Sequence, residues 1–256
     1  MRDPHVQTVH YEITSGEDIS YRDPPPLSFS NHLGTFDVAD NKLGVTPVEH
    51  FSDETGAREA IDPFLRAWEI DADLNLNVGM IRFKFDRVDI VDRDPPPSGA
   101  SQVIYAQGDS FMVVGSSVTL HLTCSKYPDP PKTFRATPEV QHAHRRWLGY
   151  HSGREPLQAM AYFVLTILER APGVRREAAR AYQIDSDVLN AIGRLSSTKG
   201  DENTARKAGA HNQYQDLSDR EKQWLEEAVR RVILRLGEHA SGAPLSLITL
   251  KDLPAI

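Results

Sequence analysis

Two arginine–histidine pairs have residue types and a spacing that could do chemistry. Arg206 precedes His211 by five positions, and Arg146 precedes His151 by the same interval. An arginine can bind a phosphate and stabilise the negative charge that develops on it, while a histidine can give or take a proton near neutral pH.

The spacing resembles the Arg-x4-His motif of ribonucleases of the higher eukaryotes and prokaryotes nucleotide-binding (HEPN) class. The resemblance covers one motif, and it implies a helical bundle that brings Arg206 and His211 to a scissile phosphate of RNA. It further implies that Arg206 stabilises the charge that develops on the phosphate, and that His211 acts as acid or base on the ribose hydroxyl and the leaving oxygen. Chance is a competing explanation, because about 2.5 pairs at spacings of four to six residues are expected from the composition, and four occur. The segment around Arg206, residues 200–209, has the composition of a loop.

A helix-turn-helix is a second candidate for nucleic-acid chemistry. Arg194 and Lys199, near the far end of its second helix, are the candidate nucleic-acid-binding residues. Asp185 and Asp187 lie at the end that would face the bases, where carboxylates repel phosphate. Gln183 occupies the turn position usually given to glycine. We therefore expect a structural helix-turn-helix inside a bundle, with a DNA reader as the alternative. The positions at which the motif would bury side chains are Ala178, Ala179, Tyr182, Ile184, Leu189 and Ile192.

Two clusters of possible metal ligands have simpler explanations. His142 and His144 would point to nearly opposite sides of a helix, so they would not share an ion, and His151 lies beyond them. Four aspartates crowd a predicted strand and its exit, where solvated like charges would discourage the addition of another strand. We predict no metal and no cofactor. The four aspartates are Asp86, Asp89, Asp92 and Asp94.

The elements that would position these residues change character at a proline-rich break, residues 127–131. Before the break, β-branched and aromatic residues predict strands, and apolar residues at helical spacing predict one helix from about residue 53 to about residue 70 that covers the sheet. Ile81, Phe83 and Phe85 share one strand parity, whereas Val88 and Ile90 share the other. This switch predicts either a bulge near residues 86–87 or a strand between two covered faces. The predicted strands are 6–13, 33–38, 43–51, 81–90 and 118–124.

After the break the pattern is helical, with predicted helices at residues 137–147, 155–170 and 218–237. Helix 155–170 has almost no polar side and should be central in its bundle. Ser218 and Glu221 form a capping box, and Gly237 is the predicted end of that helix. The predicted fold class is α+β. It comprises a mainly antiparallel sheet domain with one covering helix at residues 1–131, a helical bundle at 132–240, and a tail at 241–256 that could form an edge strand.

Charge separates the two halves. Residues 1–131 carry 10 Lys or Arg against 21 Asp or Glu, a net charge of −11, whereas residues 132–240 carry 18 against 14, a net charge of +4. A surplus of four is small beside the basic faces of nucleic-acid proteins, so docking on an acidic part of the chain itself or on a partner is favoured. The single Cys124 excludes an internal disulfide, and no apolar run is long enough for a membrane helix.

No phosphate-binding glycine loop, nucleophile elbow, zinc-protease helix or calcium loop occurs. We therefore expect a non-enzymatic, cytoplasmic two-domain interaction or accessory protein. Its helical half would bind a protein partner, and its sheet domain would be a scaffold or a second docking face. The alternatives are a nucleic-acid protein, which cleaves RNA through Arg206 and His211 or binds it through the basic helices, and a small-ligand sensor with a cleft between the halves.

Overall fold

The structure is a computed structural model that describes residues 2–94, 121–198 and 216–255. The chain divides into two compact units, Met1–Pro130 and Pro131–Ile256, called here the sheet unit and the helical unit. The predicted α+β class is confirmed, because an antiparallel sheet with one covering helix is followed by a set of helices. Among the described residues, none of the helices combines the length and the apolar character needed to cross a membrane.

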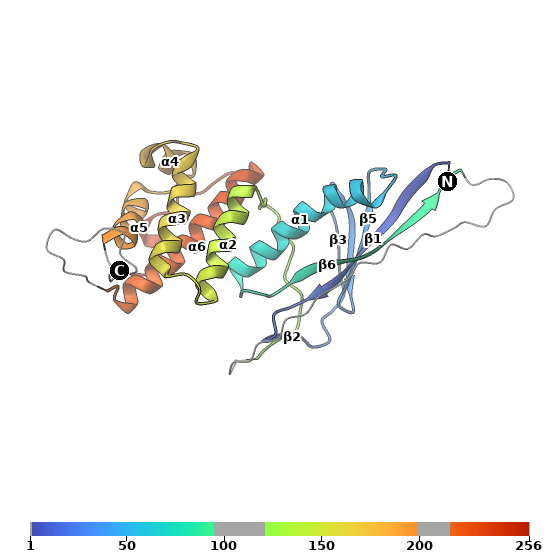
Figure 1. The fold of residues 1–256 in the computed structure, drawn as a ribbon, viewed down its shortest axis with the longest axis horizontal. Coiled ribbons are helices and arrows are strands. Elements are labelled where there is room, and N and C mark those ends of the chain that lie inside the picture. The colour runs from blue at the N-terminus through green and yellow to red at the C-terminus, as the bar shows by residue number, and fades with distance from the viewer. Residues whose placement is uncertain (1, 95–120, 199–215, 256) are drawn as a thin grey trace. The chain divides into compact units, whose positions relative to one another are not determined.

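The sheet unit is built on a five-stranded antiparallel sheet with the order β3-β4-β5-β1-β6 (Figure 1). The hairpin between β4 and β5 turns at Asp40 and Asn41, whose φ angles are 51° and 57°. Two successive positive φ angles are typical of a type I′ turn, which matches the twist of the strands it joins. The strands are β1 (Pro4–Thr14), β3 (Leu27–Ser30), β4 (Gly34–Ala39), β5 (Lys42–Pro47) and β6 (Arg82–Asp92).

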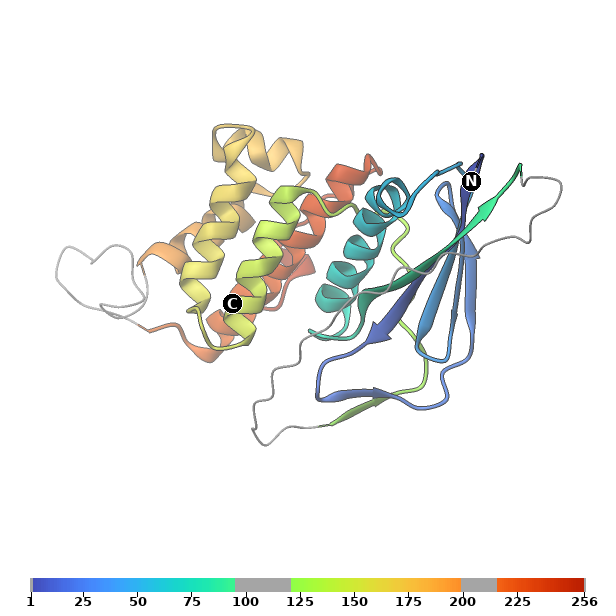
Figure 2. The same cartoon turned by 45° about the vertical axis from the view of Figure 1, so that its right-hand side comes forward.

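Helix α1 (Glu54–Asn75) lies along one face of this sheet (Figure 2). It begins at the side chain of Asp53, which accepts the Gly56 N–H at 2.9 Å. The helix runs through Pro63 without a break and ends five residues later than predicted, because its buried stripe continues to Leu74. The core between helix and sheet includes Val9, Phe36, Val45, Ile61, Leu65 and Trp68.

A bulge in β6 explains the parity switch in the sequence. Tyr11 lies opposite Phe85 and His10 lies opposite Arg87, so Asp86 is an extra residue on β6. The bulge therefore keeps Phe85 and Val88 on the same face of the sheet, the face that α1 covers. Of the two predicted alternatives, the bulge is confirmed.

A second, parallel pair of strands joins β2 (Ile19–Tyr21) to β7 (Leu122–Cys124). The sequence predicted a half-buried strand at 118–124, but residues 118–120 lie outside the described part, and Leu122 is 39% exposed. Tyr127, at the start of the predicted break, is buried in the sheet unit. Its hydroxyl donates to Asn41 Oδ1 at 3.0 Å. The core of the sheet unit thus extends to the first residue of the proline-rich segment.

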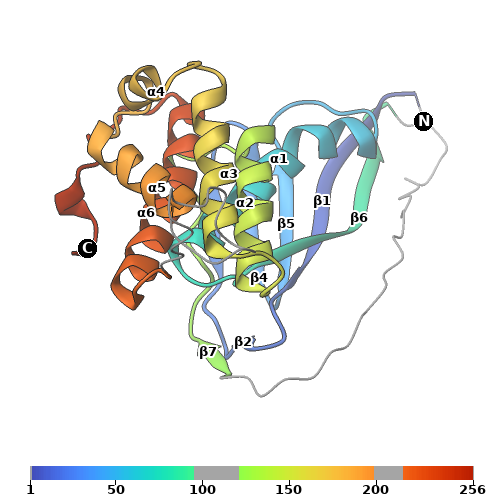
Figure 3. The same cartoon turned by 60° about the vertical axis from the view of Figure 1, so that its left-hand side comes forward.

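The helical unit consists, in its described residues, of five α-helices and a 3₁₀ turn. Helix α3 contacts each of the other four helices, which confirms its predicted central place. Figure 3 shows α2 and α3 side by side, with α4 at one end of α3. The helices are α2 (Pro138–His151), α3 (Leu157–Arg170), α4 (Arg175–Ala181), α5 (Ser186–Thr198) and α6 (Asp219–Ser241), and the turn is η1 (Leu250–Asp252).

Helix α6 begins at the predicted capping box of Ser218 and Glu221, but it does not end at Gly237 as predicted. It continues to Ser241 and ends at Gly242, whose φ of 75° is left-handed. Gly237 is instead buried in the helix, and a Cβ at this position would overlap the ring of Phe134. The glycine therefore serves close packing in the middle of the helix.

We expect Gly237→Ala to destabilise the helical unit by about 1–3 kcal/mol, since Phe134 would have to move out of its site. This cost opposes a gain in helix propensity of about 1 kcal/mol. Hydrogen exchange of α6 and α2, followed by mass spectrometry, measures the difference. Amides that exchange at the parent rate would show that Phe134 has room to shift, contrary to the expectation.

Candidate functional site

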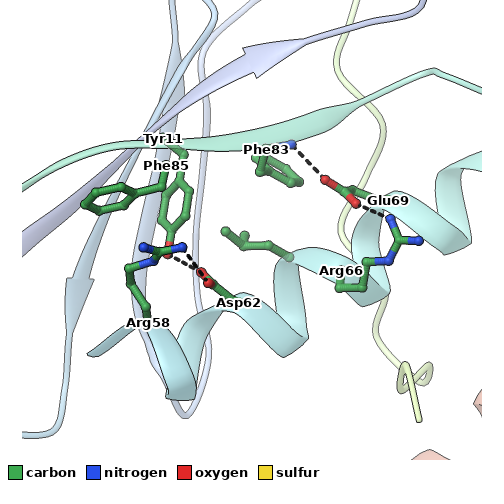
Figure 4. Close-up of a pocket in the computed structure, with 8 residues that line it drawn as sticks. Tyr11, Arg58, Asp62, Arg66, Glu69, Phe83 and Phe85 are labelled. Atoms are coloured by element: carbon green, nitrogen blue, oxygen red, sulfur yellow. Dashed lines mark hydrogen bonds and ion pairs between the residues drawn. The ribbon is translucent and has the colours of Figure 1, made fainter. Parts of the chain in front are cut away.

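A groove between α1 and the outer edge of β6 is the candidate site, and we call it the edge groove (Figure 4). It has a volume of about 200 Å³. Five of its lining residues come from successive turns of α1, two come from β6 and one from β1. They are Arg58, Asp62, Leu65, Arg66 and Glu69, then Phe83 and Phe85, then Tyr11.

The helix side of the edge groove is a ladder of alternating charges at intervals of three and four residues. Arg58 donates from Nη1 to Glu54 at 2.9 Å and from Nη2 to Asp62 at 3.4 Å. Arg66 donates to Glu69 Oε2 at 2.7 Å. Such spacings bring side chains to one face of a helix. The groove therefore has charged walls whose members are already paired.

The floor of the edge groove is aromatic. The guanidinium carbon of Arg58 lies 4.2 Å from the centroid of the Phe85 ring, and the Tyr11 ring meets Phe85 edge to face at 6.1 Å. The Tyr11 hydroxyl donates to Asp62 at 2.7 Å. Burial, and after it this hydrogen bond, raise the pKa of Tyr11 far above its ordinary value. Tyr11 is therefore a fixed donor and not an acid or base at neutral pH.

Glu69 connects the helix wall to the edge of β6. Its Oε1 accepts the backbone N–H of Phe83 at 2.8 Å, so this N–H points away from β1. Because backbone groups alternate along a strand, the N–H and C=O of Phe85 point to the same outer side. In the described residues β6 is the last strand of its sheet. The outer backbone of Phe85 thus borders the edge groove.

The aspartates of β6 serve local contacts. The Asp89 carboxylate forms a hydrogen bond of 2.8 Å with His10 Nε2, and Asp86 pairs with Arg87 at 2.9 Å. The carboxylate of Asp92 accepts the backbone N–H of Asp3 at 3.0 Å, which lowers the pKa of Asp92. No group of His, Cys, Asp or Glu in the described ranges is arranged to hold a metal ion.

A second hollow lies at the C-terminal end of α1, beside β7, and its volume is about 440 Å³. Four of its polar side chains form two pairs, since Asn75 donates to Asp71 at 3.0 Å and Lys126 to Asp129 at 3.4 Å. Cys124, which is half-buried, also lines it. These contacts do not indicate the chemistry of a ligand.

The predicted helix-turn-helix is formed by α4, a turn and α5. Gln183, at the position usually given to glycine, has a φ of 51°, in the left-handed region. The C-terminal tail covers this turn, because Asp185 N–H donates to Ile248 O at 2.8 Å and Ile248 N–H donates to Gln183 O at 3.0 Å. The tail therefore returns to the helical unit, where it forms a single β-bridge. Because the tail covers the turn, we favour a structural role for the helix-turn-helix.

The structure does not test the residues proposed from the sequence for RNA cleavage. Arg206, His211 and Lys199 lie outside the described residues, and Arg194 is exposed on α5. Arg146 pairs with Glu155 at 3.0 Å, whereas the ring centroid of His151 lies 4.4 Å from that of Trp147. These members of the second arginine–histidine pair thus have different partners. His144 is buried and His142 is exposed, as separate sides of one helix require.

Comparisons with protein families, with curated proteins and with solved structures gave no significant match. The edge groove was not predicted from the sequence. One signal for it was present, namely the charges of Glu54, Arg58, Asp62 and Arg66, which alternate in sign at intervals of four residues. That pattern marks a paired helix face, but not the strand that lies beside it.

Proposed function

We propose that this chain is an interaction or accessory protein that binds an extended segment of a protein partner by strand addition at the outer edge of β6. One observation carries the proposal: the outward backbone of Phe85 borders a groove whose other wall is α1. Main-chain hydrogen bonds to an edge strand supply affinity in this mode of recognition, and pockets for alternate side chains supply specificity.

The size of the edge groove supports a peptide over a small molecule. Sites for drug-sized ligands have volumes of about 300–1,000 Å³, whereas the edge groove has about 200 Å³. A pocket of this size is suited to a single side chain. The half-buried rings of Phe83 and Phe85 would gain cover from that side chain.

The usable edge is short. Glu69 already accepts the N–H of Phe83, and the bulge at Asp86 interrupts the regular edge on the other side of Phe85. Natural proteins use bulges and charged residues to limit unwanted strand addition. We therefore propose that a partner pairs with a few residues around Phe85 and gains its specificity from the groove.

The other expectations from the sequence are proposals with less support. The sequence favoured the helical half as the part that binds the partner, and this unit remains a proposed docking face beside the edge groove. A cytoplasmic location fits a chain with one cysteine. A nucleic-acid role has the net charge of +4 in residues 132–240 in its favour. Against DNA reading, the tail covers the turn before α5, and Asp185 and Asp187 lie at the start of that helix.

A displayed library of random dodecapeptides, selected on the full-length chain, tests the proposal. Peptides that bind should slow hydrogen exchange in the segment that contains Phe83 and Phe85, because strand addition gives the Phe85 N–H an acceptor. Phe85→Ala should weaken binding at least about tenfold, the effect of an interface anchor worth about 1.4 kcal/mol or more. Phe29→Ala is a matched control, since Phe29 is a half-buried ring on the opposite edge strand β3.

The proposal would be overturned if selected peptides bound both variants alike, or if they changed hydrogen exchange only in the helical unit. A selection that returned no binder to the parent chain would also count against it. Thermal unfolding of both variants shows whether either substitution has lost the fold. Hydrogen exchange on the parent protein gives an answer that does not depend on any variant.

A further inference from the structure

We infer that the edge groove selects a basic extended segment with one apolar anchor residue. The inference rests on the proposed strand addition and adds the chemistry of the partner. Two sets of observations carry it, the shape and polarity of the groove floor, and the charges on and around its walls.

The anchor follows from the floor. Leu65 is 3% exposed at the base of the groove, and the rings of Phe83 and Phe85 are half-buried beside it. A side chain that enters from an added strand would meet these apolar atoms first. An aliphatic or aromatic residue gains from this burial, whereas a charged residue would lose its hydration. One such residue fills the available volume.

The basic character of the partner segment follows from carboxylates on α1 that can still accept hydrogen bonds. Arg58 and Arg66 are each paired with carboxylates of the same helix. The side chain of Asp62 is 43% exposed and that of Glu54 is 29% exposed. An ionised carboxylate has about four lone-pair sites, so both can accept further donors from a lysine or arginine at the rim.

The electrostatic field of the whole sheet unit is negative, as are the carboxylates at the rim of the groove. Residues 1–131 carry a net charge of −11, which attracts a basic segment and speeds its encounter with the edge. The same charge argues against a second copy of this chain as the occupant, because two sheet units would repel each other. Charge complementarity therefore favours a basic partner over self-association.

The composition of the peptides selected from the random dodecapeptide library is the first test. Those that slow exchange at Phe83–Phe85 should be rich in Lys and Arg around one aliphatic or aromatic position. Their affinity should fall as salt is raised. Asp62→Asn should weaken them by about two- to fivefold. Asp37→Asn removes the same charge from an exposed site on β4 and should leave their affinity within the error of the parent value.

Other results of the selection distinguish failure of the inference from failure of the proposed function. Acidic or uncharged peptides that still depend on Phe85 would overturn the inference and leave the proposed function standing. Peptides that do not depend on Phe85 would remove both. A concentration-dependent dimer that Phe85→Ala dissociates would make a second copy the occupant. Peptides that bind only after residues 96–119 are replaced by a Gly-Ser linker would make the chain itself the occupant, and either result overturns the inference.

Discussion

Arg82→Met is expected to destabilise the sheet unit by about 3–5 kcal/mol, the usual cost of removing one partner from a buried ion pair. The side chain of Asp73 is completely buried in α1, and Arg82 reaches it from β6 with two hydrogen bonds of 2.9 and 2.7 Å. Asp73 also accepts the Gly79 N–H at 2.8 Å. Without the guanidinium, a buried carboxylate would lose its charge partner.

Hydrogen exchange of β4 and β5 measures this loss, because those strands report opening of the sheet unit alone. Arg87→Met is the matched control. Arg87 also lies on β6, but its partner Asp86 is 26% exposed, so we expect a loss below about 1 kcal/mol. Adding Asp73→Asn to Arg82→Met should restore part of the stability, since asparagine can still accept the Gly79 N–H without carrying charge. A double variant no more stable than the single one would contradict this account.

The sequence was sufficient to predict those parts of the sheet unit that depend on local pattern. The apolar stripe of α1 and the parity switch at Asp86 are periodic signals. The structure confirms the first as the buried face of α1 and the second as the bulge in β6. The short strands β2 and β3 were missed, because three or four residues carry too little periodicity. Their pairing is decided by the strands that lie beside them.

The candidate site was missed for a related reason. Tyr11, Asp62 and Phe85 are separated by 51 and 23 positions in the chain, and they meet only once β6 lies beside β1 as the outer strand. The residues that were predicted as sites are single motifs read along one segment. Such motifs can be found without the fold, but a groove between a helix and a strand edge cannot.

Arg235 in the helical unit shows the same dependence on distant contacts. Its side chain is 4% exposed, and its Nη1 donates to the carbonyls of Tyr182 at 2.8 Å, Gln183 at 3.0 Å and Ser246 at 2.7 Å. These acceptors belong to the turn before α5 and to the C-terminal tail. One buried guanidinium therefore joins α6, the turn and the tail.

We expect Arg235→Met to destabilise the helical unit by about 3 kcal/mol or more, because three carbonyl groups would lose a charged donor in a buried place. The tail should detach first, since its described hydrogen bonds to the turn are the two of the bridge between Ile184 and Ile248, and Ser246 O is otherwise held by the bond that it accepts from Arg235. Hydrogen exchange should therefore rise at Ile248 before it rises in α3. Arg231→Met, on the same helix with a 40% exposed side chain, should change stability by less than about 0.5 kcal/mol.

The order in which the tail and the helices lose protection from hydrogen exchange distinguishes two roles of the helix-turn-helix formed by α4 and α5. If the turn is a structural joint, Arg235→Met should open the tail, loosen α5 and create no affinity for nucleic acid. If the tail instead masks a reading helix, the same variant should bind duplex DNA or RNA in a salt-sensitive manner. Asp185 and Asp187 would then face phosphate, and their like charge makes the first outcome the expected one.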